Sequence, residues 1–163
     1  MLKKLVALAL LFSSTCQAGE VFLSYGVGIF GSADHFTGQV KMANIGYRTF
    51  IANGIYWQFK AGAWGDGSSE PDRHGSVYIS TGPGMEIDLR PFEFRSGWSL
   101  ATISTPDSYL GGRFPQFNGE AYWGVRDKNG NGAGVQYEHV SCLTFCSPNL
   151  GRDFGVLQLS HKW

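Results

Sequence analysis

The sequence lacks features that would each point to a large class of proteins. Its apolar stretch at residues 5–12 is far shorter than the roughly 20 residues that a membrane-spanning helix needs. Its 13 Lys and Arg residues balance its 13 Asp and Glu residues, so no positive excess favours a nucleic-acid partner. A helical membrane protein and a nucleic-acid-binding protein are therefore excluded, and the length of 163 residues indicates one domain.

Glycine and aromatic residues are abundant instead. The chain contains 23 glycines, 15% of its residues are aromatic, and its mean hydropathy is only −0.12. Glycine is a poor helix former, and aromatic residues are enriched in strands. The composition therefore predicts an all-β fold with tight turns.

Residues 1–18 have the pattern of a secretory signal peptide. Two lysines precede the short apolar stretch 5–12, and small and polar residues follow up to Ala18. We expect cleavage after Ala18, which leaves residues 19–163 as the mature domain. Acylation of Cys16, as in a lipoprotein, is an alternative that the polar residues in front of it disfavour.

Cysteine is scarce, and the expected cleavage removes one of the three. The mature domain keeps Cys142 and Cys146, which are four positions apart. Export brings them into an oxidising compartment, where a local disulfide is the expected state. The alternative is a pair of free, buried thiols.

From residue 20 onward, apolar and polar side chains alternate with a period of two. In a soluble β-sandwich, the apolar face is buried and the polar face is spread over solvent. Here the polar face carries charges of both signs beside glycines, and the apolar face is rich in Trp, Tyr and Phe. This combination is typical of the lumen and the lipid-facing wall of a membrane barrel, so we prefer the barrel to the sandwich.

The pattern predicts an eight-stranded antiparallel transmembrane β-barrel in the outer membrane of a Gram-negative cell. The expected strands cover residues 20–30, 36–49, 55–64, 76–88, 92–102, 117–126, 132–141 and 153–163. Most connections alternate between short turns and long polar loops, which in such barrels face the periplasm and the exterior, respectively. We also expect ion pairs inside the lumen, among Glu93, Arg95, Glu120, Arg126 and Glu138.

The second expected strand differs from the others in its phase. Val40 and Met42 alternate with Gln39 and Lys41, which puts the two apolar residues on the outward face. The alternation then changes near residues 43–46, where we expect a β-bulge.

A candidate catalytic set lies near the end of the chain. His139 and Ser141 are two apart on one strand, so they share a face with about 6 to 7 Å between their Cα atoms. A serine nucleophile needs such a base, and the base needs a carboxylate to orient it. Asp153 begins the next strand with matching outward parity. The alternative is that His139 and Ser141 only lie at the level of the lipid headgroups, where polar residues cost little.

The C-terminal region resembles a known enzyme family. His139-Val140-Ser141, followed by Pro148-Asn149, Gly151 and an acid at position 153, resembles the signature of the lipid A 3-O-deacylases of the PagL type. These are outer-membrane barrels that remove an ester-linked 3-hydroxyacyl chain from lipid A with a Ser-His-Glu triad. The resemblance implies that Ser141 is the nucleophile, His139 the base, Asp153 the orienting acid, and Asn149 a support of the oxyanion hole.

Two positions depart from the family pattern. The acid is Asp153, which is one methylene shorter than the family's Glu. Cys142-Leu143-Thr144 follow the serine where the family has Asn-Ala-Gly, whose backbone amides serve the oxyanion. A Cys142–Cys146 bridge would then shape this loop.

The leading functional hypothesis is an ester hydrolase that acts on lipid A, or lipopolysaccharide, in the outer leaflet. It requires no cofactor, and no cluster of residues with metal-ligand spacing indicates a metal site. The alternative is a non-catalytic small barrel with an adhesion, surface-masking or exclusion role. The sequence leaves open which acyl position is cut and whether the chain forms a homodimer.

Overall fold

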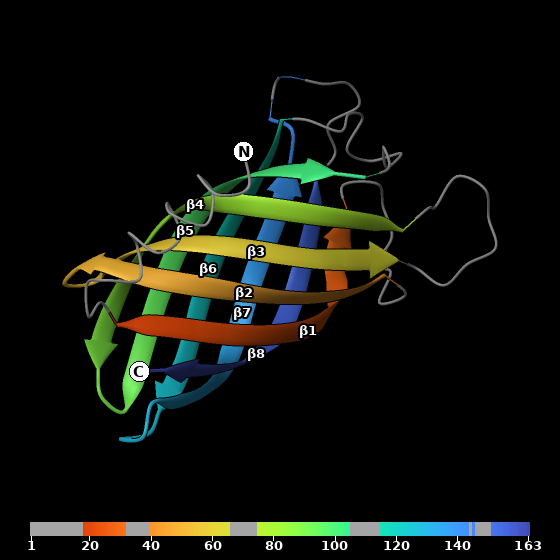
Figure 1. The fold of residues 1–163 in the computed structure, drawn as a ribbon. Helices are drawn as coiled ribbons and strands as arrows, with labels where there is room; N and C mark the ends of the chain where they lie inside the picture. The colour runs from red at the N-terminus through yellow and green to blue at the C-terminus, as the bar shows by residue number, and fades with distance from the viewer. Residues whose placement is uncertain (1–17, 32–39, 66–74, 105–114, 144, 146–150) are drawn as a thin grey trace, which may run out of the picture.

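The computed structural model describes residues 18–31, 40–65, 75–104, 115–143, 145 and 151–163. Within these ranges, eight antiparallel strands form a closed barrel (Figure 1). The strands are β1 Gly19–Gly31, β2 Lys41–Ala52, β3 Ile55–Gly65, β4 Ser76–Leu89, β5 Phe92–Ile103, β6 Gln116–Arg126, β7 Asn131–Ser141 and β8 Arg152–Lys162. Each strand pairs with its neighbours in sequence, and β8 pairs with β1, which leaves no unpaired sheet edge. None of the described residues forms a helix long and apolar enough to cross a bilayer.

The predicted fold class is confirmed, and so are most strand bounds. For every strand except β2, both predicted ends lie within one residue of the observed ends. For β2 the predicted start at residue 36 lies outside the described ranges, and the strand begins at Lys41. Its end at Ala52 lies three residues beyond the predicted end at residue 49. The expected signal peptide also lies almost entirely outside them, so its cleavage stays a prediction.

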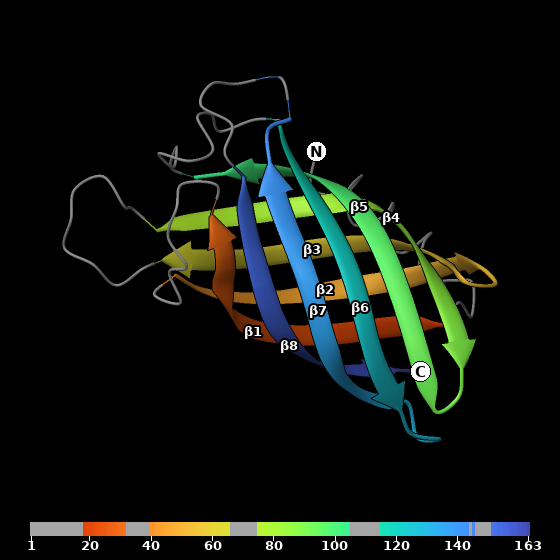
Figure 2. The ribbon, with the colours of Figure 1, turned by 180° about the vertical axis from the view of Figure 1, so that it is seen from behind.

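The barrel has two distinct rims (Figure 2). The short-turn rim carries the turns at residues 53–54, 90–91 and 127–130, together with the start of β1 and the end of β8, where the Trp163 amide donates to the Gly19 carbonyl at 3.0 Å. The long-loop rim is the opposite one, where β7 ends and β8 begins. At the short-turn rim, hydrogen bonds from the Asn131 side chain and backbone hold the pKa of the exposed Asp127 below its usual value.

The two faces of the strands differ as the alternation predicts. The outer face exposes large apolar side chains, among them Leu23, Ile45, Phe59, Ile79, Trp98, Trp123 and Leu157. The inner face buries polar and charged side chains, among them Glu20, Arg48, Lys60, Arg95, Glu120, Glu138 and Gln158. An apolar wall around a polar lumen is the arrangement of a membrane barrel and the reverse of a soluble protein.

The prediction for the start of β2 is wrong. Val40 and Met42 are 7% and 1% exposed and lie inside the barrel, whereas Lys41 is exposed outside. No bulge occurs at residues 43–46, where β2 stays in register with both neighbours, and the irregularity lies at Phe50/Ala52 instead. The inward apolar residues pack in a core cluster at the long-loop end of the lumen, with Trp64, Tyr78, Ile103, Val140, Phe154 and Val156.

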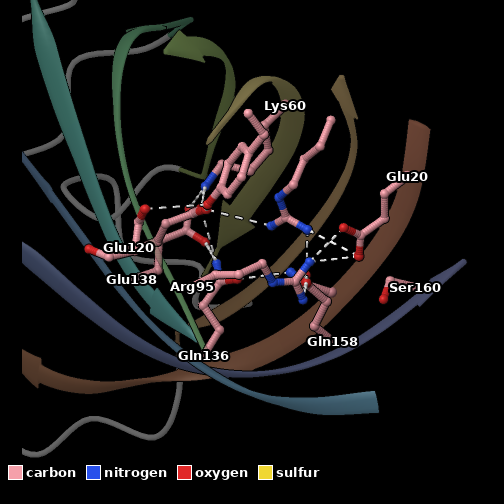
Figure 3. Close-up of polar contacts among 12 residues, drawn as sticks. Glu20, Lys60, Arg95, Glu120, Gln136, Glu138, Gln158 and Ser160 are labelled. Atoms are coloured by element: carbon pink, nitrogen blue, oxygen red, sulfur yellow. Dashed lines mark hydrogen bonds and ion pairs between the residues drawn. The ribbon is translucent and has the colours of Figure 1, made fainter. Parts of the chain in front are cut away.

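Below this cluster, ion pairs fill the lumen, as predicted (Figure 3). Arg95 and Arg126 contact Glu20 at 2.6 and 2.8 Å near the short-turn rim, and Arg126 also contacts Glu93 at 2.7 Å. Halfway along the barrel, Lys60 contacts Glu138 at 2.8 Å and Glu120 at 3.2 Å. All of these side chains are buried, so the lumen is packed in the way that a small barrel requires.

Candidate active site

The residues of the candidate site lie on the outer wall, close to the long-loop rim. His139 and Ser141 occupy outward positions near the end of β7, and Asp153 is the second residue of β8. The register of these two strands places His139 directly opposite Asp153. Directly paired residues on one face of an antiparallel sheet have Cβ atoms only about 4.5 to 5.5 Å apart, so even a short acid can reach its partner.

The base and the acid are in contact. His139 Nδ1 lies 2.7 Å from Asp153 Oδ1, and the two side chains are 39% and 20% exposed. A carboxylate at this distance accepts the Nδ1 proton, which selects the tautomer whose Nε2 carries the free lone pair. The Asp153 side chain is therefore long enough to reach His139 in this register.

Gly151 makes room for the imidazole ring. Its φ of +68° lies in the left-handed region that favours glycine, and a Cβ at this position would lie 2.8 Å from His139 Cε1 and 3.5 Å from Nε2. Val140 and Arg152 form the last pair of the β7–β8 register, and Gly151 directly precedes Arg152. The Cε1–Nε2 edge of the ring therefore lies against Gly151.

Ser141 differs from the prediction in its exposure. Its position in the alternation is outward, but the residue is only 4% exposed. In the part of the chain that the structure describes, no hydrogen bond joins it to His139. Catalytic hydrogen bonds are often long before substrate binds, and the same-face spacing keeps the two side chains within reach. In the structure, His139 and Asp153 are therefore in contact, and Ser141 lies two residues further along β7 without a hydrogen bond to His139 among the described residues.

The chain turns sharply after Ser141. The Phe145 amide donates to the Cys142 carbonyl at 3.0 Å, and Leu143 has a positive φ of 52°. A non-glycine residue in this region is uncommon and costs backbone strain, which often accumulates at functional sites. The Phe145 ring stacks on Phe117 of β6, with ring centroids 5.8 Å apart.

The remaining predicted site residues are not tested. Asn149 and Cys146 lie outside the described residues, so the support of the oxyanion hole and the Cys142–Cys146 bridge stay predictions. Cys142 itself is buried, with 1% exposure.

Sequence reasoning missed a fourth member of the site, Tyr137. Its hydroxyl donates a hydrogen bond to Asp153 Oδ1, the same oxygen that His139 contacts. Tyr137 lies two residues before His139 and shares its outward face. The signal in the sequence was this i, i+2 spacing, but without the register of β8 the partner of the hydroxyl could not be identified.

A hollow on the outer wall is lined mostly by apolar side chains. It has a volume of about 700 Å³ and lies over β1 to β5, with Tyr47, Phe59, Ile79 and Leu100 among its lining residues. It lies away from β7 and β8, and its exposed side chains suit lipid chains. Among the described residues, no three or more His, Cys, Asp or Glu side chains converge as metal ligands would.

Similar folds occur among solved structures of outer-membrane barrels. The crystal structure of the outer membrane enzyme PagL superimposes with a TM-score of 0.65 at 19% sequence identity, covering 87% of this chain and 98% of that chain. The Yersinia pestis outer membrane protein Ail has a TM-score of 0.57 at 11% identity, covering 90% and 99%. Neisserial surface protein A has a TM-score of 0.57 at 8% identity, covering 90% and 96%. No protein-family model matches the sequence, and no curated protein does.

Proposed function

We propose that the chain is an outer-membrane ester hydrolase that removes an ester-linked 3-hydroxyacyl chain from lipid A, the membrane anchor of lipopolysaccharide. The observation that carries this proposal is the 2.7 Å contact between His139 and Asp153 on the outer wall, with Ser141 beside it on the same strand. A half-exposed acid–base pair on a wall that otherwise exposes apolar side chains is costly in lipid unless it has a use there. The sequence resemblance to the lipid A 3-O-deacylases and the fold shared with PagL support the same function.

The orientation in the membrane follows from the rims. In outer-membrane barrels the short turns face the periplasm and the long loops face the exterior. The long-loop rim, where β7 ends, then lies on the outer side, and His139 lies at the level of the outer leaflet. Lipid A is the lipid of that leaflet, so its acyl esters would diffuse along the wall that carries the site.

The proposed reaction is an acyl transfer in two steps. Ser141 Oγ attacks the ester carbonyl while His139 Nε2 takes its proton, and Asp153 stabilises the imidazolium that forms. The intermediate collapses as His139 protonates the departing sugar oxygen, which leaves an acyl group on Ser141. Water then attacks this acyl-enzyme, His139 accepts the water's proton and returns it to Ser141, and the fatty acid is released. These steps use side chains and water alone.

The decisive experiment is mass spectrometry of lipid A from Gram-negative cells that express the protein or an empty vector. We expect a loss of mass equal to one 3-hydroxyacyl chain in the cells that contain the wild-type protein. The matched control is Ser141→Ala, produced at the same level in the outer membrane, which should leave lipid A unchanged. An intact lipid A in the presence of correctly assembled wild-type protein would exclude this activity.

A non-catalytic surface barrel is the second candidate. The observation that favours it is the burial of Ser141, together with the lack of a bond from it to His139 among the described residues. Ail, whose name describes an attachment invasion locus protein, has the same fold. If lipid A stays intact, adhesion of cells that carry the barrel to host-matrix components is the next measurement.

A further inference from the structure

The acid of the candidate site has a second hydrogen-bond donor besides the histidine. Asp153 Oδ1 accepts from Tyr137 and contacts His139 Nδ1. Both donors come from β7, on the same face and two residues apart, whereas the acceptor comes from β8. One carboxylate oxygen is therefore held from two sides by a single strand.

The register explains how Tyr137 reaches this oxygen. Its direct partner on β8 is Gly155, and Asp153 is the diagonal neighbour on the side of the long-loop rim. Diagonal neighbours lie about 7 to 8 Å apart, which an aromatic side chain can span. Because Gly155 has no side chain, nothing from that position stands between the phenol ring and Asp153.

The surroundings make this second donor important. The outer wall next to the site exposes apolar residues, including Trp98, Trp123 and Val135. A carboxylate on such a wall has few water molecules to bind, and an unpaired polar group in hydrocarbon is destabilising. The two hydrogen bonds to one oxygen supply polar partners at this place on the wall, and they limit rotation about the Asp153 side chain.

We propose that Tyr137 is a positioning residue of the site. It fixes the Asp153 carboxylate, and the carboxylate in turn orients His139 to take the proton of Ser141. This inference rests on the proposed ester hydrolase function. Tyr137 does not touch the reacting atoms, so it acts through Asp153 alone. It takes over the anchoring of an acid that is one methylene shorter than the Glu of the resembling enzymes.

The test compares two tyrosine variants of the full-length protein in lipid-containing micelles, with purified lipid A as substrate. Tyr137→Phe removes only the hydroxyl and should lower kcat about tenfold with little change in KM, since a hydrogen bond to a charged group is lost while the lipid-facing ring is kept. Tyr25→Phe is the matched control, because Tyr25 is exposed on the outer face of β1. It should retain wild-type kcat.

A double-mutant cycle separates positioning from a general structural effect. In an Asp153→Asn background, Tyr137→Phe should have almost no further effect on kcat, because the residue through which it acts is already disabled. Equal losses in both backgrounds would overturn the inference, and so would a Tyr137→Phe variant with wild-type kcat.

A spectroscopic measurement decides the point without turnover. In the Ser141→Ala protein, the ¹⁵N signals of His139 should report a neutral ring protonated at Nδ1, and added Tyr137→Phe should weaken that preference. If Tyr137→Phe leaves the histidine spectrum unchanged, the inference is overturned, even where the wild-type protein is active. If the wild-type protein releases no fatty acid but the histidine spectrum shifts as expected, the proposed hydrolase function fails, whereas the contact from Tyr137 through Asp153 to His139 stands.

Discussion

Glu138 and His139 are consecutive residues of β7 that face opposite sides of the barrel wall. Inside, Glu138 is fully buried and accepts hydrogen bonds from Lys60, Tyr78 and Asn118 on one oxygen, at 2.8, 3.1 and 2.6 Å. Outside, His139 contacts one carboxylate and keeps 39% of its side chain exposed. A carboxylate beside a basic side chain therefore occurs twice, once fully buried in the lumen and once partly exposed on the outer wall.

The difference indicates which group can react. The carboxylate of Glu138 accepts several hydrogen bonds and is fully buried, so a reactant cannot approach it (Figure 3). The outer histidine has Nδ1 engaged by Asp153, and its Cε1–Nε2 edge lies beside Gly151, which has no side chain. Lumen variants should therefore change stability and outer-wall variants should change activity, and the following predictions test this contrast.

Ser141→Ala should give the largest effect on activity. In the proposed mechanism this removes the nucleophile, so fatty-acid release should fall by a factor on the order of 10⁶, as in a serine protease. The midpoint of urea unfolding in micelles should stay close to that of the wild-type protein, because the change removes one hydroxyl. A variant that keeps deacylating lipid A would show that Ser141 is not the nucleophile.

Asp153→Ala should cost less activity than the loss of Ser141, because in the proposed mechanism Asp153 orients the base and does not itself react. The expected loss in kcat is about 10⁴-fold. Asp153→Glu is the informative companion, since it restores the acid of the resembling enzymes and should retain most of the activity. The kinetics of fatty-acid release for both variants test this prediction. An Asp153→Glu variant as inactive as Asp153→Ala would contradict it.

Lys60→Met should have the largest effect on stability. It leaves Glu120 and Glu138 buried without their shared cation, and breaking such a buried pair costs about 3–5 kcal/mol in the free energy of unfolding. Lys41→Met is the matched control, because Lys41 is exposed at the outer end of β2 and should change little. Equilibrium unfolding in urea measures both, and equal effects would refute the structural role of the lumen network.

Gly151→Ala and Gly54→Ala form a matched pair with smaller effects. Both glycines have a φ near +70°, and a Cβ would meet a neighbour at 2.8 and 2.7 Å. Each substitution should cost about 1 kcal/mol of stability, from the left-handed backbone. Only Gly151→Ala should also lower kcat, since the neighbour that it displaces is the His139 ring. Equal activities of the two variants would contradict this role of Gly151.

The smallest effect should come from the exposed turn at residues 127–130. The pKa of Asp127 is lowered by its hydrogen bonds from Asn131, so the folded state binds this proton less readily than the unfolded chain. Its contribution to stability is present above the ordinary value of 3.8 and is lost as the pH falls through the lower folded-state value. Asp127→Asn should flatten this pH dependence slightly, as urea midpoints at pH 7 and pH 3 would reveal. An unchanged slope would contradict the prediction.

Sequence reasoning succeeded where the information is local. The period of two identified the strands and the faces of β1 and β3 to β8, because successive side chains of a strand must point to opposite sides. It failed at Val40 and Met42, where apolar residues turn inward. Their environment comes from six residues on five other strands, which no local pattern can reveal.

Within the candidate site, the sequence by itself determined that His139 and Ser141 share a face, since their spacing on one strand requires it. It also supplied an acid of matching parity at position 153. Only the tertiary structure decided that this acid lies directly opposite His139 and that Tyr137 shares it, because parity along each strand does not fix the register between β7 and β8. Closure of the barrel brings Glu20 of β1 against Arg95 of β5, across 75 residues of sequence. Contacts across a lumen depend on where distant strands meet, and this is a property of the closed sheet.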